Sequence, residues 1–579
     1  MRFVHAGYLG GLAVGACLVF AACAQAQERP QPEATVSVAE RRSVQAQNFM
    51  IATAHPLATR AGHAVLAAGG TAADAAVVVQ TMLGLVEPQS SGLGGGAFLL
   101  YWDAQAGQLT TYDARETAPL AADQSYWLDE NGEPLAFRDA VIGGRSAGVP
   151  GTPLLLATLH RDHGALPWAS LMQPAIETAE RGFAVTKRMA GAVAAAEGLD
   201  RFVTAAEYFL PGGKPVAEGS NLKNPAYAQT LRLFAEEGAT PFYTGEIAER
   251  IVAALRTNIN PGILSMKDFA AYKVVRRASV CSDYRDYEIC GMGPPSSGAL
   301  TIGEILGVLE RFDIGSMADG PAFRHLFVEA SRLAFADRAL YMADSDFVDV
   351  PRGLLDPAYL AERARLVDPD ASMGVAAPGA PPGLDGGNLA PDGERPRKGT
   401  SHFVIVDEAG DMISATTTIE SGFGNRIMTG GFLLNNELTD FSFVPEADGA
   451  PVANRVEPGK RPRSSMAPTI VFKDGKPVLL TGSPGGAAII HYTALSLISI
   501  LDWEMDPQEA IDLPHVTNLN GRTTIEQGEG AEELATALEA LGHEVAIGDL
   551  NSGLHVIAIT DDGLVGAADK RREGLVMGD

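Results

Sequence analysis

Two apolar runs on either side of a short turn predict a β-hairpin late in the chain. Residues 402–406 (HFVIV) suit a largely buried strand, residues 408–410 (EAG) supply the turn, and residues 412–418 return. Antiparallel pairing about this turn places Thr400 opposite Thr418, because paired residue numbers then sum to about 818. Directly opposed side chains share a face of the sheet. We therefore expect two hydroxyl groups to face each other at the start of this hairpin.

A second hairpin is predicted over residues 466–482, which are apolar on both sides of a KDGK turn. Here the paired numbers sum to about 949, which sets Ser464 opposite Gly485 and Ser465 opposite Pro484. Adjacent glycines leave backbone N–H groups open to an incoming oxygen, and serine hydroxyls beside them can bind a carboxylate. The pattern therefore favours a functional site here over the alternative that these serines and glycines only form turns.

Helical periodicity fills much of the remaining chain. Strands cluster near the start and after Thr400, with helices between them, and this order suits a four-layer αββα sandwich of the α+β class. Helices are predicted at residues 57–68, 72–85, 325–341 and 532–541, and further strands at 97–102 and 554–560.

The composition changes beyond residue 366. Proline, glycine, aspartate and alanine dominate as far as residue 392, and few apolar side chains are available for burial. Residues 366–399 are therefore predicted to form a flexible linker that exposes the Gly399–Thr400 bond.

Overall composition narrows the class of protein. The chain has 579 residues, of which 46% are hydrophobic, so it can bury a large core. Its formal net charge is −27 at pH 7, which argues against nucleic acid and anionic membrane surfaces as partners. A soluble enzyme fits these values.

The first 26 residues resemble a bacterial export signal. A basic Arg2 precedes an apolar run over residues 8–22, and Ala24-Gln25-Ala26 offers a cleavage site that leaves Gln27 first. The run is short for a membrane-spanning helix, so we expect a periplasmic or secreted protein without stable membrane insertion. Lipoprotein anchoring through Cys23 is the alternative.

Two of the four cysteines, Cys281 and Cys290, follow this segment and flank a short turn. A disulfide between them is plausible in an oxidising compartment. The sequence shows no cluster of histidine, cysteine and carboxylate residues with metal-ligand spacing, so we expect neither a metal nor another cofactor.

A threonine that starts a strand directly after glycine has the features of an N-terminal nucleophile. Once the Gly399–Thr400 bond breaks, the freed α-amine of Thr400 can act as the base for its own hydroxyl. An arbitrary Gly-Thr pair is merely the start of a strand, so the sequence context has to decide.

That context closely resembles the small subunit of γ-glutamyltransferases, which are members of the N-terminal nucleophile hydrolase superfamily. The resemblance runs from about residue 48 to residue 574. The segments that carry it are 400–403 (TSHF), 418–424 (TIESGFG), 434–441 (LNNELTDF), 463–469 (RSSMAPT) and 482–486 (GSPGG).

The resemblance implies self-cleavage before Thr400 into a large subunit, residues 27–399, and a small catalytic subunit, residues 400–579. The two would stay together as a heterodimer. Thr400 would attack the γ-carbonyl of glutathione or a related γ-glutamyl amide and pass the acyl group to water, an amino acid or a peptide. Thr418 would position Thr400, and the N–H groups of Gly485 and Gly486 would stabilise the oxyanion.

The resemblance also implies a pocket for the two charges of the γ-glutamyl group. A planar, two-pronged arginine suits a carboxylate, and carboxylates suit an ammonium. The residues concerned are Arg115, Ser464 and Ser465 for the α-carboxylate, and Glu420, Glu437 and Asp440 for the α-ammonium.

The chain departs from the family pattern at three points. Glu420 replaces a frequent asparagine, Ala487-Ala488 follows the double glycine where an arginine is common, and residues 441–463 hold no tyrosine for a lid. Two alternatives therefore stay open. One is a glutaryl or cephalosporin acylase-type amidase of the same superfamily, which needs no ammonium pocket. The other is an unprocessed binding protein, which needs no intact nucleophile.

Overall fold

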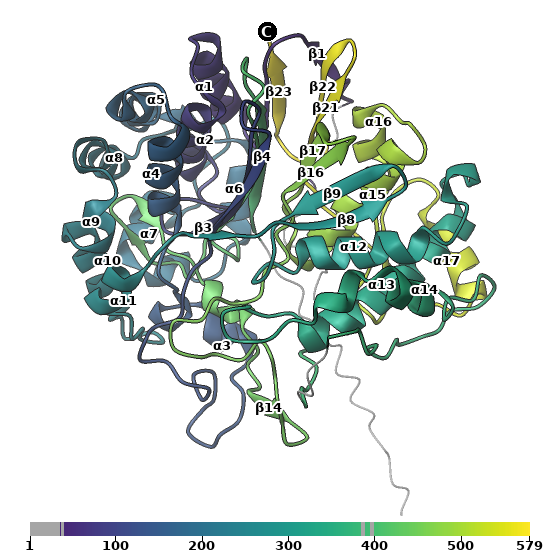
Figure 1. The fold of residues 1–579 in the computed structure, drawn as a ribbon. Helices are drawn as coiled ribbons and strands as arrows, with labels where there is room; N and C mark the ends of the chain where they lie inside the picture. Colours follow the sequence, from purple (N-terminus) through teal and green to yellow (C-terminus); the bar gives the residue numbers. More distant parts are fainter. Residues whose placement is uncertain (1–34, 36–39, 384–387, 394–398) are drawn as a thin grey trace, which may run out of the picture.

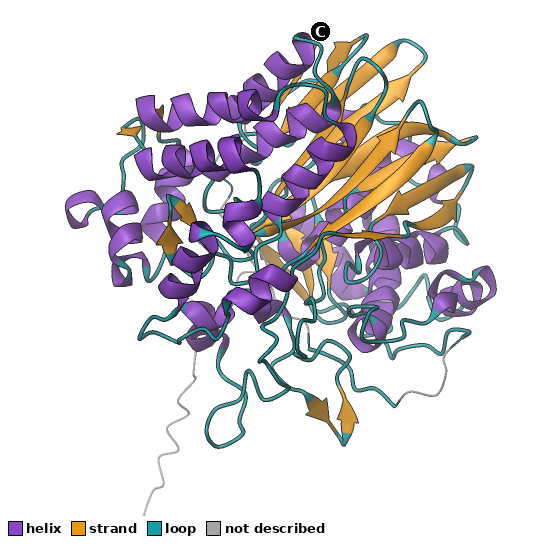
Figure 2. Ribbon diagram, turned by 60° about the vertical axis from the view of Figure 1, so that its left-hand side comes forward, coloured by secondary structure: helices purple, strands orange, loops and turns teal. Residues whose placement is uncertain are grey.

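Two seven-stranded sheets lie face to face with helices on both outer sides (Figures 1 and 2). The computed structural model describes residues 35, 40–383, 388–393 and 399–579. The αββα sandwich expected from the sequence is confirmed. The predicted export signal, residues 1–26, lies outside the described residues.

One sheet carries the predicted nucleophile. Its strand order is β23-β2-β10-β11-β3-β4-β7, and every neighbouring pair is antiparallel. The strands in that order are β23 (Leu575–Gly578), β2 (Met50–Thr53), β10 (Ser401–Val406), β11 (Met412–Thr418), β3 (Gly96–Asp103), β4 (Gln108–Ala114) and β7 (Val275–Arg277).

The second sheet packs against the inner face of the first and has the order β1-β22-β21-β17-β16-β9-β8. Its strands are β1 (Val44–Ala46), β22 (Gly563–Ala568), β21 (His555–Thr560), β17 (Lys476–Gly482), β16 (Thr469–Lys473), β9 (Tyr287–Gly291) and β8 (Val280–Tyr284).

The predicted first hairpin is confirmed as β10 and β11. Ser401 pairs with Thr417 and Val406 with Met412, which is the expected register. Alternate residues of β10 face opposite layers. Phe403 joins the core on the helical side of the sheet, whereas Val404 joins the core between the two sheets.

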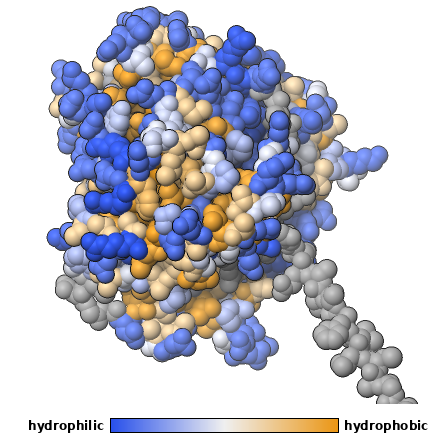
Figure 3. Space-filling view, turned by 90° about the vertical axis from the view of Figure 1, so that its right-hand side faces the viewer, coloured by the Kyte–Doolittle hydropathy of each residue, from blue (hydrophilic) through white to orange (hydrophobic). Residues whose placement is uncertain are grey.

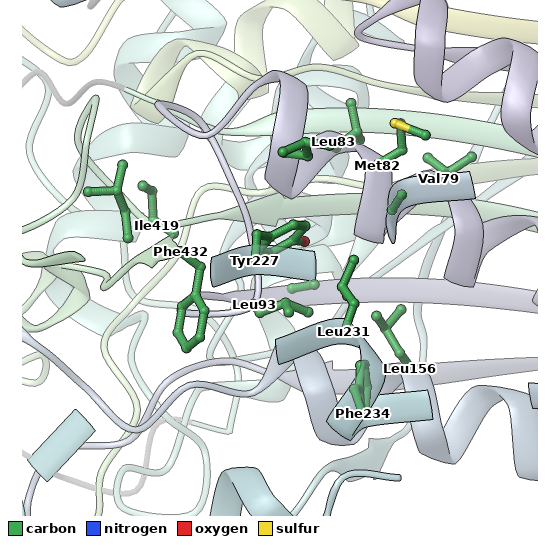
Figure 4. Packing of buried hydrophobic residues seen from close by; sticks show 14 of the residues in the cluster. Val79, Met82, Leu83, Leu93, Leu156, Tyr227, Leu231, Phe234, Ile419 and Phe432 are labelled. Carbon is green, nitrogen blue, oxygen red and sulfur yellow. The ribbon is translucent and has the colours of Figure 1, made fainter. Parts of the chain in front are cut away.

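A first helical layer covers the outer face of the nucleophile's sheet. The long buried helix α2 contacts both β10 and β11, and the aromatic and aliphatic side chains of α8, Tyr227, Leu231 and Phe234, pack in the same core (Figure 4). The main helices of this layer are α1 (Pro56–Ala67), α2 (Ala72–Val86), α4 (Thr152–His163), α5 (Trp168–Arg181) and α8 (Pro225–Glu237).

A second helical layer covers the other sheet. Helix α13 is buried along almost all of its length and packs on α12 and α17, while α12, α15 and α16 contact the strands directly. The bounds are α12 (Gly298–Leu309), α13 (Pro321–Tyr341), α15 (Ile489–Leu501), α16 (Pro507–Asp512) and α17 (Ala531–Ala540).

The second predicted hairpin exists as β16 and β17, but its predicted register is wrong beyond the turn. A bulge between Val471 and Phe472 changes the pairing sum from 949 near the turn to 950, so Thr469 pairs with Thr481. The ladder ends at Thr469. Ser464 and Ser465 therefore do not oppose Gly485 and Pro484 within it.

The predicted flexible, exposed linker also needs correction. Gly399 and Thr400 are both buried, so the bond between them is not exposed. Part of residues 366–399 is bound to the body of the protein through backbone N–H groups. These bonds are Met373 to Glu329 at 2.7 Å, Ala376 to Asn520 at 2.7 Å and Gly379 to Asp337 at 2.6 Å.

At the edge of the second sheet, β8 and β9 form a hairpin that closes on a disulfide. Cys281 and Cys290 are paired across the two strands, and a bond joins their sulfurs. The expected turn lies between Tyr284 and Tyr287.

Among the described residues, no helix has both the length and the apolar character needed to cross a membrane. The face drawn in Figure 3 presents hydrophilic side chains around a central area where hydrophobic ones gather.

Candidate active site

The Thr400 and Thr418 hydroxyls meet at the end of the first hairpin. Thr400 Oγ1 donates a hydrogen bond to Thr418 Oγ1 over 3.1 Å. The same Thr418 oxygen accepts the backbone N–H of Glu420 at 2.8 Å. Two donors thus fix the Thr418 oxygen as an acceptor, and it holds the Thr400 hydroxyl in one orientation.

The backbone around Thr400 is strained and tightly held. Its φ is 91° and that of Gly399 is 134°, a region that β-branched residues avoid. The Thr400 N–H donates to the Ser90 carbonyl at 3.2 Å, and Arg572 Nη1 donates to the Thr400 carbonyl at 3.3 Å. Glycine is required at position 399, since a Cβ there would lie 1.9 Å from the Glu420 carbonyl oxygen.

One cavity opens onto this pair of hydroxyls. Nearly every residue predicted for the site lines it, although these residues come from distant segments of the chain. The predicted residues on its wall are Thr400, Thr418, Arg115, Glu420, Glu437, Asp440, Ser464, Ser465 and Gly486.

Arg115 follows β4 and is buried in the wall of the cavity. Its two terminal nitrogens form ion pairs with Glu437 and Asp440. Its Nε donates to the Pro462 carbonyl at 3.2 Å, and its Nη2 also donates to the Arg463 carbonyl at 3.0 Å. These contacts fix the plane of the guanidinium, so it presents a rigid cationic surface.

Glu420 sits at the turn after β11 with a φ of 72°. Its Oε2 accepts hydrogen bonds from the Ser421 hydroxyl, at 2.5 Å, and from the Asn436 amide. The side-chain oxygen of Asn436, Oδ1, in turn accepts the Ser421 N–H at 2.9 Å. Asn436 is buried, and this small network holds the Glu420 carboxylate beside Thr418.

Burial shifts the acid–base behaviour of the carboxylates. It raises the pKa of Glu437 to about 7, although the Arg115 guanidinium acts in the opposite direction. Behind Glu437, the fully buried Glu116 has a pKa well above its ordinary value, because of burial and the charge of Glu437. Burial thus favours the protonated form of Glu116.

The two serines lie on a segment that the cis-proline loop clamps. The bond between Pro294 and Pro295 is cis. The Pro295 carbonyl accepts the Ser464 N–H at 2.9 Å, and the Ser464 carbonyl accepts the N–H of Ser297 at 2.8 Å. Contacts from a loop some 170 residues away, not the β16–β17 ladder, thus carry Ser464 and Ser465 to the cavity.

The double glycine forms a sharp turn between β17 and helix α15. Gly485 has a φ of 136° and Gly486 a φ of 59°, both in the region open to glycine. Gly486 begins a short 3-10 turn, Gly486–Ala488, that leads directly into α15. Backbone N–H groups at the start of a helix suit a developing negative charge.

The sequence reasoning did not identify four residues that contact the site. Ser90 and Arg572 hold the backbone of Thr400, Asn436 holds Glu420, and Arg338 donates to the Ser465 hydroxyl at 2.7 Å. Asn436 lies inside the segment 434–441 that carries the family resemblance, so that motif contains a signal for it. Arg338 lies on α13 and has no such signal.

One buried cluster elsewhere has a metal-like composition. His325, Glu329 and His543 lie close together near the outer helices. His325 Nδ1 and His543 Nε2 are 2.7 Å apart, and His325 Nε2 is 2.8 Å from the Asp368 carbonyl. Glu329 accepts from Arg332. Protein partners thus satisfy the cluster, and none of its residues lines the cavity.

The sequence matches a known family over most of its length. The family model described as Gamma-glutamyltranspeptidase matches residues 58–579. A glutathione hydrolase proenzyme of Bacillus subtilis (strain 168) is 36% identical over 543 residues, which cover 91% of each protein. One of Escherichia coli (strain K12) is 35% identical over 583 residues, covering 97% of this chain and 98% of that protein.

The fold is similar to that of solved structures as well. A cephalosporin acylase from Bacillus halodurans superposes with a TM-score of 0.82 at 28% sequence identity. The match covers 93% of this chain and 97% of that one.

Proposed function

Because the chain belongs to the γ-glutamyltranspeptidase family, we propose that it is a γ-glutamyltransferase with glutathione hydrolase activity. The observation that carries this proposal is the hydroxyl pair of Thr400 and Thr418, 3.1 Å apart, on a cavity that also holds Arg115 and three acids. A nucleophile and a binding place for both charges of an amino acid lie within one cavity.

We propose that Thr400 first acts on its own chain. Its hydroxyl attacks the Gly399 carbonyl, the acyl group moves from nitrogen to oxygen, and water then hydrolyses the ester. The strained backbone of Thr400 supports this step, because cleavage relieves the strain. The products are the large fragment, residues 27–399, and the small fragment, residues 400–579.

Cleavage turns the Thr400 amide into an α-amine beside its own hydroxyl. The Ser90 carbonyl, which accepts the amide N–H at 3.2 Å, is placed to orient this amine. The amine removes the proton of the hydroxyl as the oxygen attacks the γ-carbonyl of the donor. It then passes that proton to the leaving amine, and a γ-glutamyl ester on Thr400 remains.

The N–H groups of Gly485 and Gly486 would stabilise the oxyanion that forms during attack. Gly486 lines the same cavity as Thr400, and both glycines lie at the start of the turn that leads into α15, which supports that role. The ester is released by water, which gives hydrolysis, or by the amine of an amino acid or peptide, which gives transfer.

The donor would be held by its two α-substituents. Its carboxylate would bind Arg115 and the hydroxyls of Ser464 and Ser465, and its ammonium would bind the carboxylates of Glu420, Glu437 and Asp440. Arg115 already pairs with two of these acids. A bound zwitterion would therefore extend an existing pattern of alternating charge.

The place of action is also a proposal. The export-type sequence before Gln27 supports a periplasmic or secreted enzyme, with removal of residues 1–26. The disulfide between Cys281 and Cys290 supports an oxidising compartment.

One experiment tests the activity against the acylase alternative. Purified protein is assayed with a γ-glutamyl anilide and with the glutaryl anilide, which differs by lacking the α-ammonium. We expect a preference for the γ-glutamyl donor. Asp440→Asn should lower its kcat/KM roughly 30- to several-thousand-fold, by analogy with losing one partly buried charged contact.

Turnover of the glutaryl donor by Asp440→Asn should stay unchanged or improve. Thr400→Ala is the matched control and should neither self-cleave nor turn over either donor. If the wild type prefers the glutaryl donor and Asp440→Asn slows both donors equally, the acylase activity replaces the proposed one.

A further inference from the structure

Arg338 reaches the cavity from α13, and neither the family motifs nor the mechanism above gives it a role. Its side chain is 3% exposed and its backbone belongs to the long helix of the second helical layer. The Phe335 ring, 5.4 Å from the guanidinium carbon, supports it on one side. Arg338 is also one of the residues that line the cavity.

The Arg338 guanidinium makes a fork between two serines. Nη2 donates to the Ser465 hydroxyl at 2.7 Å, and Nε donates to the Ser297 hydroxyl at 2.8 Å. Ser297 Oγ then donates to the Ser464 carbonyl at 2.7 Å. One side chain thus fixes both the backbone at Ser464 and the hydroxyl at Ser465.

The hydrogen-bonding chemistry of Arg338 determines the direction of the Ser465 hydroxyl proton. An arginine has five N–H donors and no acceptor, so the Ser465 oxygen can only accept from it. The hydroxyl must place its own proton elsewhere. Ser465 is only half-buried, and it lines the cavity beside Arg115. Its O–H is therefore directed toward an acceptor in the cavity.

The Ser464 hydroxyl oxygen also accepts a hydrogen bond from the protein. The backbone N–H of Met466 donates to Ser464 Oγ at 3.1 Å, so this oxygen is also an acceptor within the protein. Both serines are left with one O–H each to offer. Two O–H donors and a guanidinium on one cavity wall match the two oxygens of a carboxylate.

We propose that Arg338 is a positioning residue that sets the carboxylate specificity of the site, resting on the proposed γ-glutamyl activity. It acts through Ser465, whose hydroxyl it turns into a dedicated donor to the α-carboxylate of the donor substrate. It does not contact the reacting carbonyl. Its loss should therefore raise KM and leave kcat nearly unchanged.

The test uses Arg338→Met and three anilide donors. The γ-glutamyl donor has both α-substituents, the glutaryl donor has only the carboxylate, and the 4-aminobutyryl donor has only the ammonium. Losing one aligned hydrogen bond to a charged group should raise KM roughly tenfold for the first two donors. Values for the 4-aminobutyryl donor should not change.

Four further variants separate positioning from structure. Ser465→Ala should reproduce the pattern, and adding Arg338→Met to it should cost little more, because the two residues act as one unit. Arg338→Lys keeps the charge and a donor and should recover part of the affinity. Arg332→Met is the matched control on the same helix, since it removes another buried arginine that does not line the cavity.

The outcomes are distinct. If Arg338→Met weakens all three donors equally, or if Arg338→Met and Arg338→Lys both fail to fold and self-cleave, Arg338 is a structural residue and the proposal falls. If its effect adds fully to that of Ser465→Ala, it does not act through Ser465. If the wild type does not turn over the γ-glutamyl donor, the proposed function fails instead.

Discussion

Single charges dominate the chemistry of the cavity. Arg115 is buried between Glu437 and Asp440. Removing a charge from water is costly unless a partner compensates for it. Because Arg115 is already paired with Glu437 and Asp440, a ligand that carries both a carboxylate and an ammonium leaves the charge balance of the cavity unchanged, whereas a ligand with one charge alters it. The residues themselves thus favour a zwitterionic end group.

The raised pKa of Glu437 predicts a pH dependence for donor choice. With a pKa of about 7, Glu437 is ionised above that value and becomes neutral as the pH falls through it. Binding of the donor's ammonium requires the ionised form. The ratio of kcat/KM for γ-glutamyl to glutaryl anilide should therefore fall below pH 7, approaching tenfold per pH unit.

The ratio is the useful measurement, because the α-amine of Thr400 also titrates and affects both donors alike. Glu437→Gln should give a lower ratio that no longer varies with pH between 5 and 8. A wild-type ratio that stays constant over that range would show that Glu437 does not control binding of the ammonium.

Whether a site residue could be located from the sequence depends on whether local or distant contacts position it. Thr400 and Thr418 could be found from the sequence because both lie at the open end of one tight hairpin. Its register sets them opposite each other, and opposed side chains share a face of the sheet. Ser464 and Ser465 could be assigned to the site but not placed by pairing. Their position depends on Pro295, Ser297 and Arg338, whose separation in sequence hides the contact.

The β8–β9 hairpin is the element most dependent on a covalent bond. It forms the edge of its sheet, so only β9 has a neighbour on its other side, β16. The Cys281–Cys290 bond closes a loop with a sequence separation of 9 residues. Replacing both cysteines with serine should lower the free energy of unfolding by about 2–3 kcal/mol, the chain-entropy value for so short a loop.

Denaturant unfolding with and without a reducing agent checks this expectation. Neither cysteine lines the cavity, so kcat and KM of the double variant should match those of the wild type. A loss of activity with unchanged stability would contradict this view of the hairpin.

Elements were easier to predict than their details. The helices α1, α2 and α13 and both central hairpins follow clear periodic patterns. The bulge between Val471 and Phe472 is not visible in a pattern, because one inserted residue leaves the composition unchanged. Residues 366–399 look unstructured because they lack apolar side chains, yet hydrogen bonds to Glu329, Asp337 and Asn520 bind the described part.

At the scale of the whole molecule, the two proposed fragments are interleaved. Strands β10 and β11 of the small fragment lie between β2 and β3 of the large one, and β16 pairs with β9. Each of the two main hydrophobic cores contains side chains from both sides of residue 400. Separation of the fragments would therefore amount to unfolding.

We expect the fragments to migrate as one particle after cleavage, even at about 1 M salt, where charge interactions are strongly screened. Size-exclusion chromatography followed by a denaturing gel makes the measurement. The bands of the large and the small fragment should both come from one chromatographic peak at low and at high salt. The two fragments should separate only in denaturant. Release of the small fragment by salt alone would mean that charges, not the shared cores, join them.

The contact between Arg572 and the Thr400 carbonyl ties the scissile region to a residue 172 positions further along the chain. Strand β23, which follows Arg572, pairs with β2 in the same sheet as β10. The backbone of Thr400 therefore gains its support only when distant segments of the chain have folded together. We expect self-cleavage to follow folding of the whole sheet, not formation of the β10–β11 hairpin alone.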